Sequence, residues 1–164
     1  MASARRISLE PNSLYVATSA LANGRFHWSV IHVDEYGRCI KHHWVAINND
    51  SKGREAYIRR SFTYESSQSM LAFFKLSEYR PIPSANFEAT CATIFPQSFD
   101  TAAQNRAHGM SCATWVLALL ARSFPPEYVS RIDKTVTRHS AQYCAQFTTA
   151  YFHGKPYFAI MMDI

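Results

Sequence analysis

The chain has 164 residues, of which 48% are hydrophobic and 18% charged, and its formal net charge is +5. This length and composition fit one globular domain with its own core, and they exclude a disordered, collagenous or repeat protein. The basic residues are scattered and form no nucleic-acid-binding motif, so no nucleic-acid partner is expected. The four cysteines are widely spaced and include no C-x-x-C pair, which argues against a disulfide scaffold or a zinc ribbon.

The N-terminal residues 1–12 are expected to form a flexible tail, followed by a single α+β domain over residues 13–164. The tail lacks the apolar stretch of a secretory signal. The longest apolar helical run, residues 113–121, is too short to span a bilayer. These features predict a cytoplasmic protein without a transmembrane segment, and they leave the oligomeric state open.

Strand patterns dominate the first half of the chain. Aromatic and β-branched residues predict strands over residues 14–18, 26–34, 38–47 and 54–64. Between the second and third of these, Glu35-Tyr36-Gly37 has the form of a three-residue hairpin loop with glycine in the left-handed position. Apolar residues at helical spacing then predict a short amphipathic helix over residues 66–76.

The second half mixes strands and helices. We expect a strand over residues 87–95, a polar connection over 97–108 and a helix from Cys112 to near Phe124. A longer helix over residues 127–149 and a terminal strand over 157–162 complete the chain. The predicted fold class is therefore α+β, with an antiparallel β-sheet packed against helices.

Cys112 is the leading candidate for a nucleophile. Ser111 is a good N-cap, so Cys112 falls at a helix start, where free amides and the helix dipole favour a thiolate. The same amides could hold the oxyanion of an acyl intermediate. The competing interpretation is core packing, because Cys112 continues a helical stripe with Trp115, Val116 and Leu119.

Two His-Trp pairs on predicted strands, His27-Trp28 and His43-Trp44, offer a catalytic base. With the three-residue loop, the numbers of paired residues sum to 72, so His43 lies opposite Ser29 and on the same sheet face as His27. Same-face neighbours of this kind lie close enough for a hydrogen bond. The sequence thus places a second histidine beside the first.

A four-residue loop would lower the sum to 71 and put His42 in place of His43. We favour His43, because Glu-Tyr-Gly suits a glycine-bulge loop, and His42 stays open. A metal site built from Cys39, His42 and His43 lacks a clear fourth ligand. No metal or cofactor is therefore expected.

The order of these motifs resembles the circularly permuted papain-like fold, specifically the NlpC/P60-related proteins of the lecithin:retinol acyltransferase type. The counterparts are the strand His27-Trp28-Ser29-Val30, the second histidine His43, and the helix start running from Ser111 to Val116. Serine stands where that family usually has asparagine before the cysteine, and the hairpin is longer. The sequence is also similar to a family of uncharacterised fungal proteins that pairs an H-W strand with a G-C-x-x-W-V helix start.

The residues and the resemblance together predict a thiol acyltransferase or hydrolase with a Cys112-His27-His43 site. Cys112 would attack an ester, thioester or amide carbonyl, His27 would move the proton, and His43 would orient the imidazole. The surrounding apolar and aromatic residues favour a small hydrophobic, lipid-like or bulky substrate. The alternative is a non-hydrolytic small-molecule-binding protein, or a cyclase or isomerase, that uses the histidines alone.

This hypothesis carries a geometric expectation. Strand 26–34 should lie next to the start of the Cys112 helix, because the sheet must bury one face against helices. An imidazole nitrogen of His27 should come within about 4 Å of the sulfur. His43 should lie on the far side of His27 from the sulfur and on the same sheet face.

Overall fold

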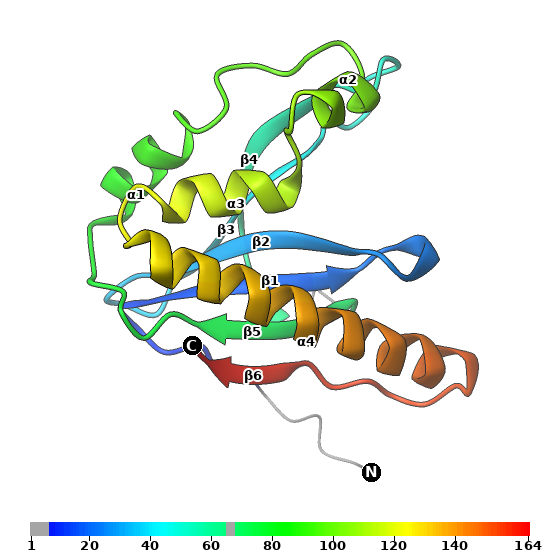
Figure 1. Cartoon of the computed structure of the whole chain (residues 1–164). Helices are drawn as coiled ribbons and strands as arrows, with labels where there is room; N and C mark the ends of the chain where they lie inside the picture. Colours follow the sequence, from blue (N-terminus) through cyan, green and yellow to red (C-terminus); the bar gives the residue numbers. More distant parts are fainter. Residues whose placement is uncertain (1–6, 65–67) are drawn as a thin grey trace.

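The structure, a computed structural model, describes residues 7–64 and 68–164. Within these residues the chain forms a six-stranded sheet and four α-helices (Figure 1), which confirms the α+β class. The strands are β1 (Ser13–Ala20), β2 (Phe26–Val33), β3 (Cys39–Ala46), β4 (Glu55–Ser61), β5 (Met70–Lys75) and β6 (Ile160–Asp163). The helices are the 3-10 turn η1 (Ala22–Gly24), α1 (Ser84–Cys91), α2 (Ala102–Ala107), α3 (Cys112–Leu120) and α4 (Pro126–Phe152).

The strand order is β4-β3-β2-β1-β5-β6, and all neighbours are antiparallel except β5 and β6, which are parallel. The expected antiparallel pairing is therefore confirmed for four of the five strand pairs, and the parallel β5–β6 pair makes the sheet mixed. The reason lies in α4, which precedes β6 in the chain and runs back along one face of the sheet (Figure 1). Because this helical crossover returns the chain to the end of the sheet where β5 begins, β6 can pair with β5 in the parallel direction.

The hairpin register agrees with the count made from the sequence. Val30 pairs with His42 and Val33 with Cys39, so the paired numbers sum to 72. The amide of Asp34 donates to the carbonyl of Arg38, and Gly37 has φ 78° at the end of the Glu35–Gly37 loop. A glycine meets this left-handed backbone without the steric cost of a side chain.

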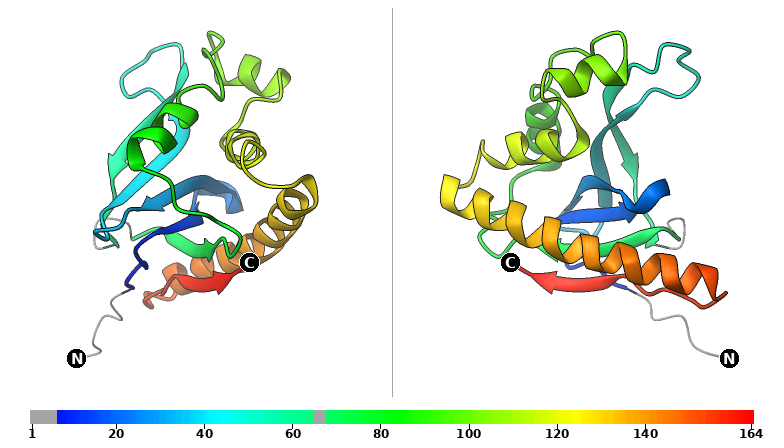
Figure 2. Two further views of the ribbon diagram at one scale, coloured as in Figure 1. Left: turned by 90° about the vertical axis from the view of Figure 1, so that its left-hand side faces the viewer. Right: turned by 45° about the vertical axis from the view of Figure 1, so that its right-hand side comes forward.

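Helices α3 and α4 cover one face of the sheet. Helix α3 packs on β2 and β3, whereas α4 lies along β1 and β5, as both views of Figure 2 show. Trp115 of α3, Ile132 of α4 and Val16 of β1 are fully buried in the core between the helices and the sheet. The apolar face of α3 thus covers β2 and β3, as the sequence predicts.

The opposite face carries a second, smaller core cluster. It contains Ile31, Phe62 and Phe73, and the partly buried Ile7 and Leu9 pack against it. Burial on both faces explains why β5 has a nearly continuous apolar sequence. Of the expected flexible tail, residues 1–6 lie outside the described residues, whereas residues 7–12 include these two packed side chains.

The prediction of a helix over residues 66–76 is wrong for the part of this range that the structure describes. Met70–Lys75 form strand β5, and residues 65–67 lie outside the described part of the chain. Strand β5 lies between β1 and β6 and sends Leu71 and Phe74 to one core and Phe73 to the other. A strand buried on both faces has no alternation, so its apolar run cannot be told from a helix by periodicity.

The strand expected over residues 87–95 is also wrong, because Ser84–Cys91 form helix α1. Its buried residues, Phe87 and Cys91, are four positions apart and so share one helical face. The polar connection over 97–108 contains a further helix, α2, which begins at a capping box between Thr101 and Gln104. The sequence contains this signal as the pattern Thr-x-x-Gln, although the prediction of a polar connection does not use it.

Candidate active site

The structure places Cys112 as the first residue of α3, as the sequence predicts. Ser111 is the N-cap, and its hydroxyl accepts from the amide of Thr114 at 3.1 Å. The Thr114 hydroxyl accepts in turn from the Ser111 amide at 2.8 Å. Gly109 makes the turn before the helix with φ 71°. Local hydrogen bonds therefore fix the helix start on both sides of the cysteine.

The capping box leaves two amides at the helix start without a partner. It uses the amide of the third helical residue, so the amides of Cys112 and Ala113 make no hydrogen bond among the described residues. Both belong to the positive end of the helix dipole. Two adjacent free amides beside a sulfur can stabilise an oxyanion on a bound carbonyl.

The Cys112 sulfur lies against the backbone of β2. The amide of Trp28 donates to Sγ at 3.5 Å, and the side chain of Cys112 is half-buried. This contact is possible because the pairing of β2 with β3 ends at Val30 and His42, which leaves the next part of β2 open on that side. Strand 26–34 thus lies next to the helix start, as expected.

A buried polar cluster holds the turn that leads into Cys112. The Glu55 carboxylate on β4 accepts from Trp44 at 3.3 Å, from Asn105 at 2.8 Å and from Arg106 at 2.7 Å. Arg106 also donates to the carbonyl of Met110 at 2.6 Å, and it lies within electrostatic range of Cys112. This cluster connects β3, β4 and α2 to the residues just before the nucleophile.

The charge state of Glu55 follows from these contacts. Burial alone raises the pKa of the Glu55 carboxyl, but the hydrogen bonds from Arg106 and Asn105 outweigh it, and the pKa is lowered. Sequence reasoning missed this cluster, because Glu55 and Arg106 are 51 positions apart and belong to no motif. The capping box of α2 is the one local feature that hints at an ordered segment here.

His27 and His43 form the predicted pair. Nε2 of His27 lies 2.8 Å from Nδ1 of His43, with the rings edge to face at 74°. His42, the open alternative, is hydrogen-bonded instead to the Tyr57 hydroxyl at 2.7 Å. The three-residue loop therefore selects His43 as the partner of His27, as favoured from the sequence.

Both histidines of the pair are neutral at pH 7. Burial, followed by the charge of Lys41, lowers the pKa of His27 to about 4. The same two causes, with the charge of Arg60 among the smaller ones, lower the pKa of His43 to about 3. Lys41 is itself half-buried and makes no hydrogen bond or ion pair with the described residues. A neutral imidazole is the form that can accept a proton.

The two histidines lie on the sheet face opposite α3. Trp28 and Val30 belong to the core beneath the helices, whereas Ile31 and Val33 belong to the second cluster. Because side chains alternate along a strand, His27 shares the face of Ile31. The sulfur meets the sheet through the main chain at Trp28, and no hydrogen bond among the described residues joins it to either imidazole. The expected contact between a His27 nitrogen and the sulfur is therefore absent from this structure, because the imidazole emerges on the other face of the sheet.

Two more histidines, His32 and His42, pack in the core beneath the helices. His32 stacks on Phe87 with ring centroids 4.7 Å apart, and Phe87 also meets the ring of His42 edge-on. Tyr57, which binds His42, stacks on Trp115 of α3. These contacts assign His32 and His42 to packing under α1 and α3. His42 and His43 also point to opposite faces, so Cys39, His42 and His43 do not converge on one metal.

Among the described residues, no helix has the combined length and hydrophobicity needed to cross a bilayer. Comparison of the chain with protein-family models, with curated proteins and with solved structures finds no match.

Proposed function

We propose that this protein is a cysteine-dependent acyl transferase or hydrolase, with Cys112 as nucleophile, His27 as proton acceptor and His43 as the residue that orients His27. One observation carries the proposal. The Cys112 sulfur lies at a helix start where two amides have no partner within residues 7–64 and 68–164, and it touches the amide that follows His27 in the chain. Nucleophile and oxyanion donors thus lie beside the strand that carries the proposed base.

The reaction follows from these groups. His27 removes the thiol proton as the sulfur attacks the carbonyl carbon of an ester, thioester or amide. The amides of Cys112 and Ala113 then receive the negative charge on the carbonyl oxygen. When the tetrahedral intermediate collapses, His27 returns its proton to the leaving alcohol, thiol or amine, and an acyl thioester remains on Cys112.

The second half of the reaction uses the same residues. His27 removes a proton from water or from an acceptor, whose oxygen or nitrogen attacks the thioester carbon. The acyl group leaves the enzyme, and the sulfur recovers its proton from His27. Water as the attacking group makes the protein a hydrolase, and any other acceptor makes it a transferase.

The His43 contact sets which nitrogen of His27 is available. When Nε2 of His27 donates to Nδ1 of His43, the lone pair on Nδ1 of His27 is left to accept the thiol proton. For this step the imidazole must move from the sheet face opposite α3 toward the sulfur, at the part of β2 that β3 leaves open. Catalytic contacts commonly form or tighten only when substrate binds. The order of His27, His43 and Cys112 in the chain supports our further proposal that the fold is a circularly permuted papain-like one.

Acylation by activated esters tests the proposal directly. With p-nitrophenyl esters of increasing chain length, we expect a burst of nitrophenol and an intact-mass increase of one acyl group located at Cys112. The longer esters should react faster, because we propose a hydrophobic, lipid-like or bulky acyl group. Cys112→Ala should abolish both signals, and His27→Ala should slow acylation by about 100-fold or more, the usual size of a general-base contribution.

His153→Ala is the matched control for the loss of a histidine, because His153 is exposed and lies at the end of α4. This variant should acylate like the unmodified protein. If Cys112→Ala retains the burst, the nucleophile is assigned wrongly. If His27→Ala reacts as fast as His153→Ala, the base is assigned wrongly.

A second function, a binding protein or an isomerase that uses the histidines alone, is favoured by one observation. His27 and His43 lie on the sheet face that α3 does not cover, so their acid–base chemistry does not require the sulfur. In that case Cys112 is a packing residue against the main core, and no acyl group should appear on it in the ester experiment.

A further inference from the structure

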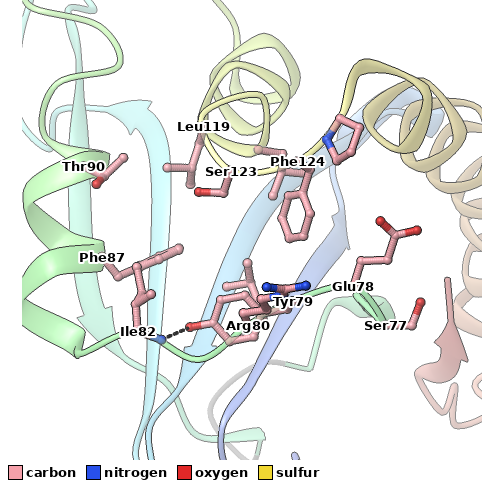
Figure 3. Close-up of a pocket in the computed structure, with 13 residues that line it drawn as sticks. Ser77, Glu78, Tyr79, Arg80, Ile82, Phe87, Thr90, Leu119, Ser123 and Phe124 are labelled. Carbon is pink, nitrogen blue, oxygen red and sulfur yellow. Dashed lines mark hydrogen bonds between the residues drawn. The ribbon is translucent and has the colours of Figure 1, made fainter.

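A cavity of about 690 Å³ lies at the opposite end of α3 from Cys112. It is enclosed by the end of α3 and the turn after it, the segment 77–82 and helix α1 (Figure 3). Leu119 of its wall is seven residues beyond Cys112, which is about 10 Å along a helix. The cavity is therefore separate from the candidate active site, and its volume is that of a small-molecule site.

The inner wall of this cavity is apolar. Leu14, Leu120 and Phe87 each expose 5% or less of their surface, and Leu119 and Phe124 are also buried. Figure 3 shows Phe87, Leu119 and Phe124 arranged around the open space. A hydrocarbon chain or ring placed here would exclude water from side chains that are already held in place by the core.

One cation at this cavity has no counter-ion among the described residues. Arg80 lines the cavity and makes no hydrogen bond or ion pair with any described residue. The neighbouring acid, Glu78, accepts from Arg131 of α4 at 3.3 Å, so its charge is partly balanced from outside the cavity. An acid group on a ligand would therefore meet an unpaired guanidinium, whose planar donors suit a carboxylate.

We propose that this cavity binds an organic carboxylate whose alkyl chain or ring fills the apolar wall while its acid group pairs with Arg80. This site does not involve Cys112, so the binding proposal can be tested independently of the proposed enzyme activity. Charge complementarity selects an anion, and the volume and the apolar wall select one with a hydrophobic body.

Three probes separate these two requirements. Decanoate carries both the chain and the charge, decanol carries the chain alone, and acetate carries the charge alone. Calorimetric titration of the whole chain, below the concentration at which decanoate forms micelles, should show saturable one-site binding of decanoate. Decanol should bind at least tenfold more weakly, because it lacks the charge-assisted hydrogen bonds, and acetate should not bind measurably.

Two variants locate the site. Arg80→Ala should weaken decanoate binding by about tenfold or more and leave decanol binding unchanged. Ser123→Phe should block the cavity to both probes, because Ser123 is an exposed residue on its wall. Arg122→Ala and Arg122→Phe, at the exposed position next to Ser123, are the matched controls and should bind decanoate normally.

Other results would overturn the proposal. If decanoate does not bind, the cavity has no such ligand. If Arg80→Ala binds decanoate as tightly as Arg122→Ala does, the cation has no role. If Ser123→Phe and Arg122→Phe bind decanoate equally, binding occurs elsewhere on the surface. Thermal unfolding of each variant shows whether the substitution has altered folding, and all four changes are at exposed positions.

Discussion

The buried histidines make the stability of this protein depend on pH. Burial, together with nearby cationic groups, lowers the pKa of His42 and His43 to about 3 and that of His27 to about 4, from 6.5 in the unfolded chain. Between these values the unfolded state binds protons that the native state excludes. The free energy of unfolding should therefore be largest above pH 6.5 and should fall as the pH drops toward 4.

The slope of this loss can be measured. Each excluded proton contributes about 1.4 kcal/mol per pH unit within the window. Urea unfolding at several pH values between 4.5 and 7.5 should show the decline, and His42→Gln should make it shallower, while His153→Ala should leave it as it is. A free energy of unfolding that is flat over this range would contradict the assignment of neutral buried histidines.

Glu55 helps to hold the turn before Cys112 through Arg106, which also binds the carbonyl of Met110. It exposes only 6% of its side chain and receives hydrogen bonds from three other residues. Glu55→Ala would remove the acceptor that these donors share and would leave the Trp44 indole and one side of the Arg106 guanidinium unpaired. The free energy of unfolding should therefore fall by about 3 kcal/mol. Hydrogen exchange of residues 107–113 should also become faster.

Glu88→Ala is the matched control for this change. Glu88 pairs with Arg59 at 3.0 Å on the surface, where the two side chains are 41% and 50% exposed. A pair of this kind contributes about 0.5 kcal/mol or less. Equal losses from Glu55→Ala and Glu88→Ala would show that the buried cluster is not what secures the turn.

At the scale of single elements, the start of α3 links local structure to reactivity. Ser111→Ala removes an N-cap, which should lower the free energy of unfolding by about 1 kcal/mol. It should also loosen the amides of Cys112 and Ala113 and so slow acylation of Cys112. Thr101→Ala removes the same kind of cap from α2 and should cost similar stability.

The two cap variants give different readouts. Acylation of Cys112 should be slower in Ser111→Ala than in Thr101→Ala, because only the first changes the amides beside the sulfur. Equal rates of acylation in the two would mean that the helix start contributes nothing beyond stability.

The sequence predicts correctly those elements whose apolar residues recur at a regular spacing or whose ends carry a defined turn or cap. The β2–β3 hairpin and its register follow from alternation and from Gly37, and the start of α3 follows from Ser111. For residues 70–75 and 84–91 the sequence predicts the wrong type of element, and the reasons differ. The first lacks alternation because both faces of β5 are buried, and the second is a short helix with few buried positions.

At the scale of the whole molecule, the candidate site combines local and distant information. Counting residues within one hairpin is enough to predict the His27–His43 pair, because both lie on adjacent strands. The Glu55–Arg106 cluster and the Trp28 amide at the Cys112 sulfur join segments 51 and 84 positions apart. Contacts of this range depend on how α2 and α3 pack on the sheet, which no local pattern encodes.

The central claim is that His27 activates Cys112, and the rate at which iodoacetamide alkylates Cys112 at pH 7 tests it most directly. Mass spectrometry of the peptides separates Cys112 from the half-buried Cys39, which serves as an internal reference. We expect Cys112 to be alkylated much faster than Cys39 in the unmodified protein and in His153→Ala, and at least tenfold more slowly in His27→Ala. An inert Cys112, or a rate that does not change in His27→Ala, would contradict the account.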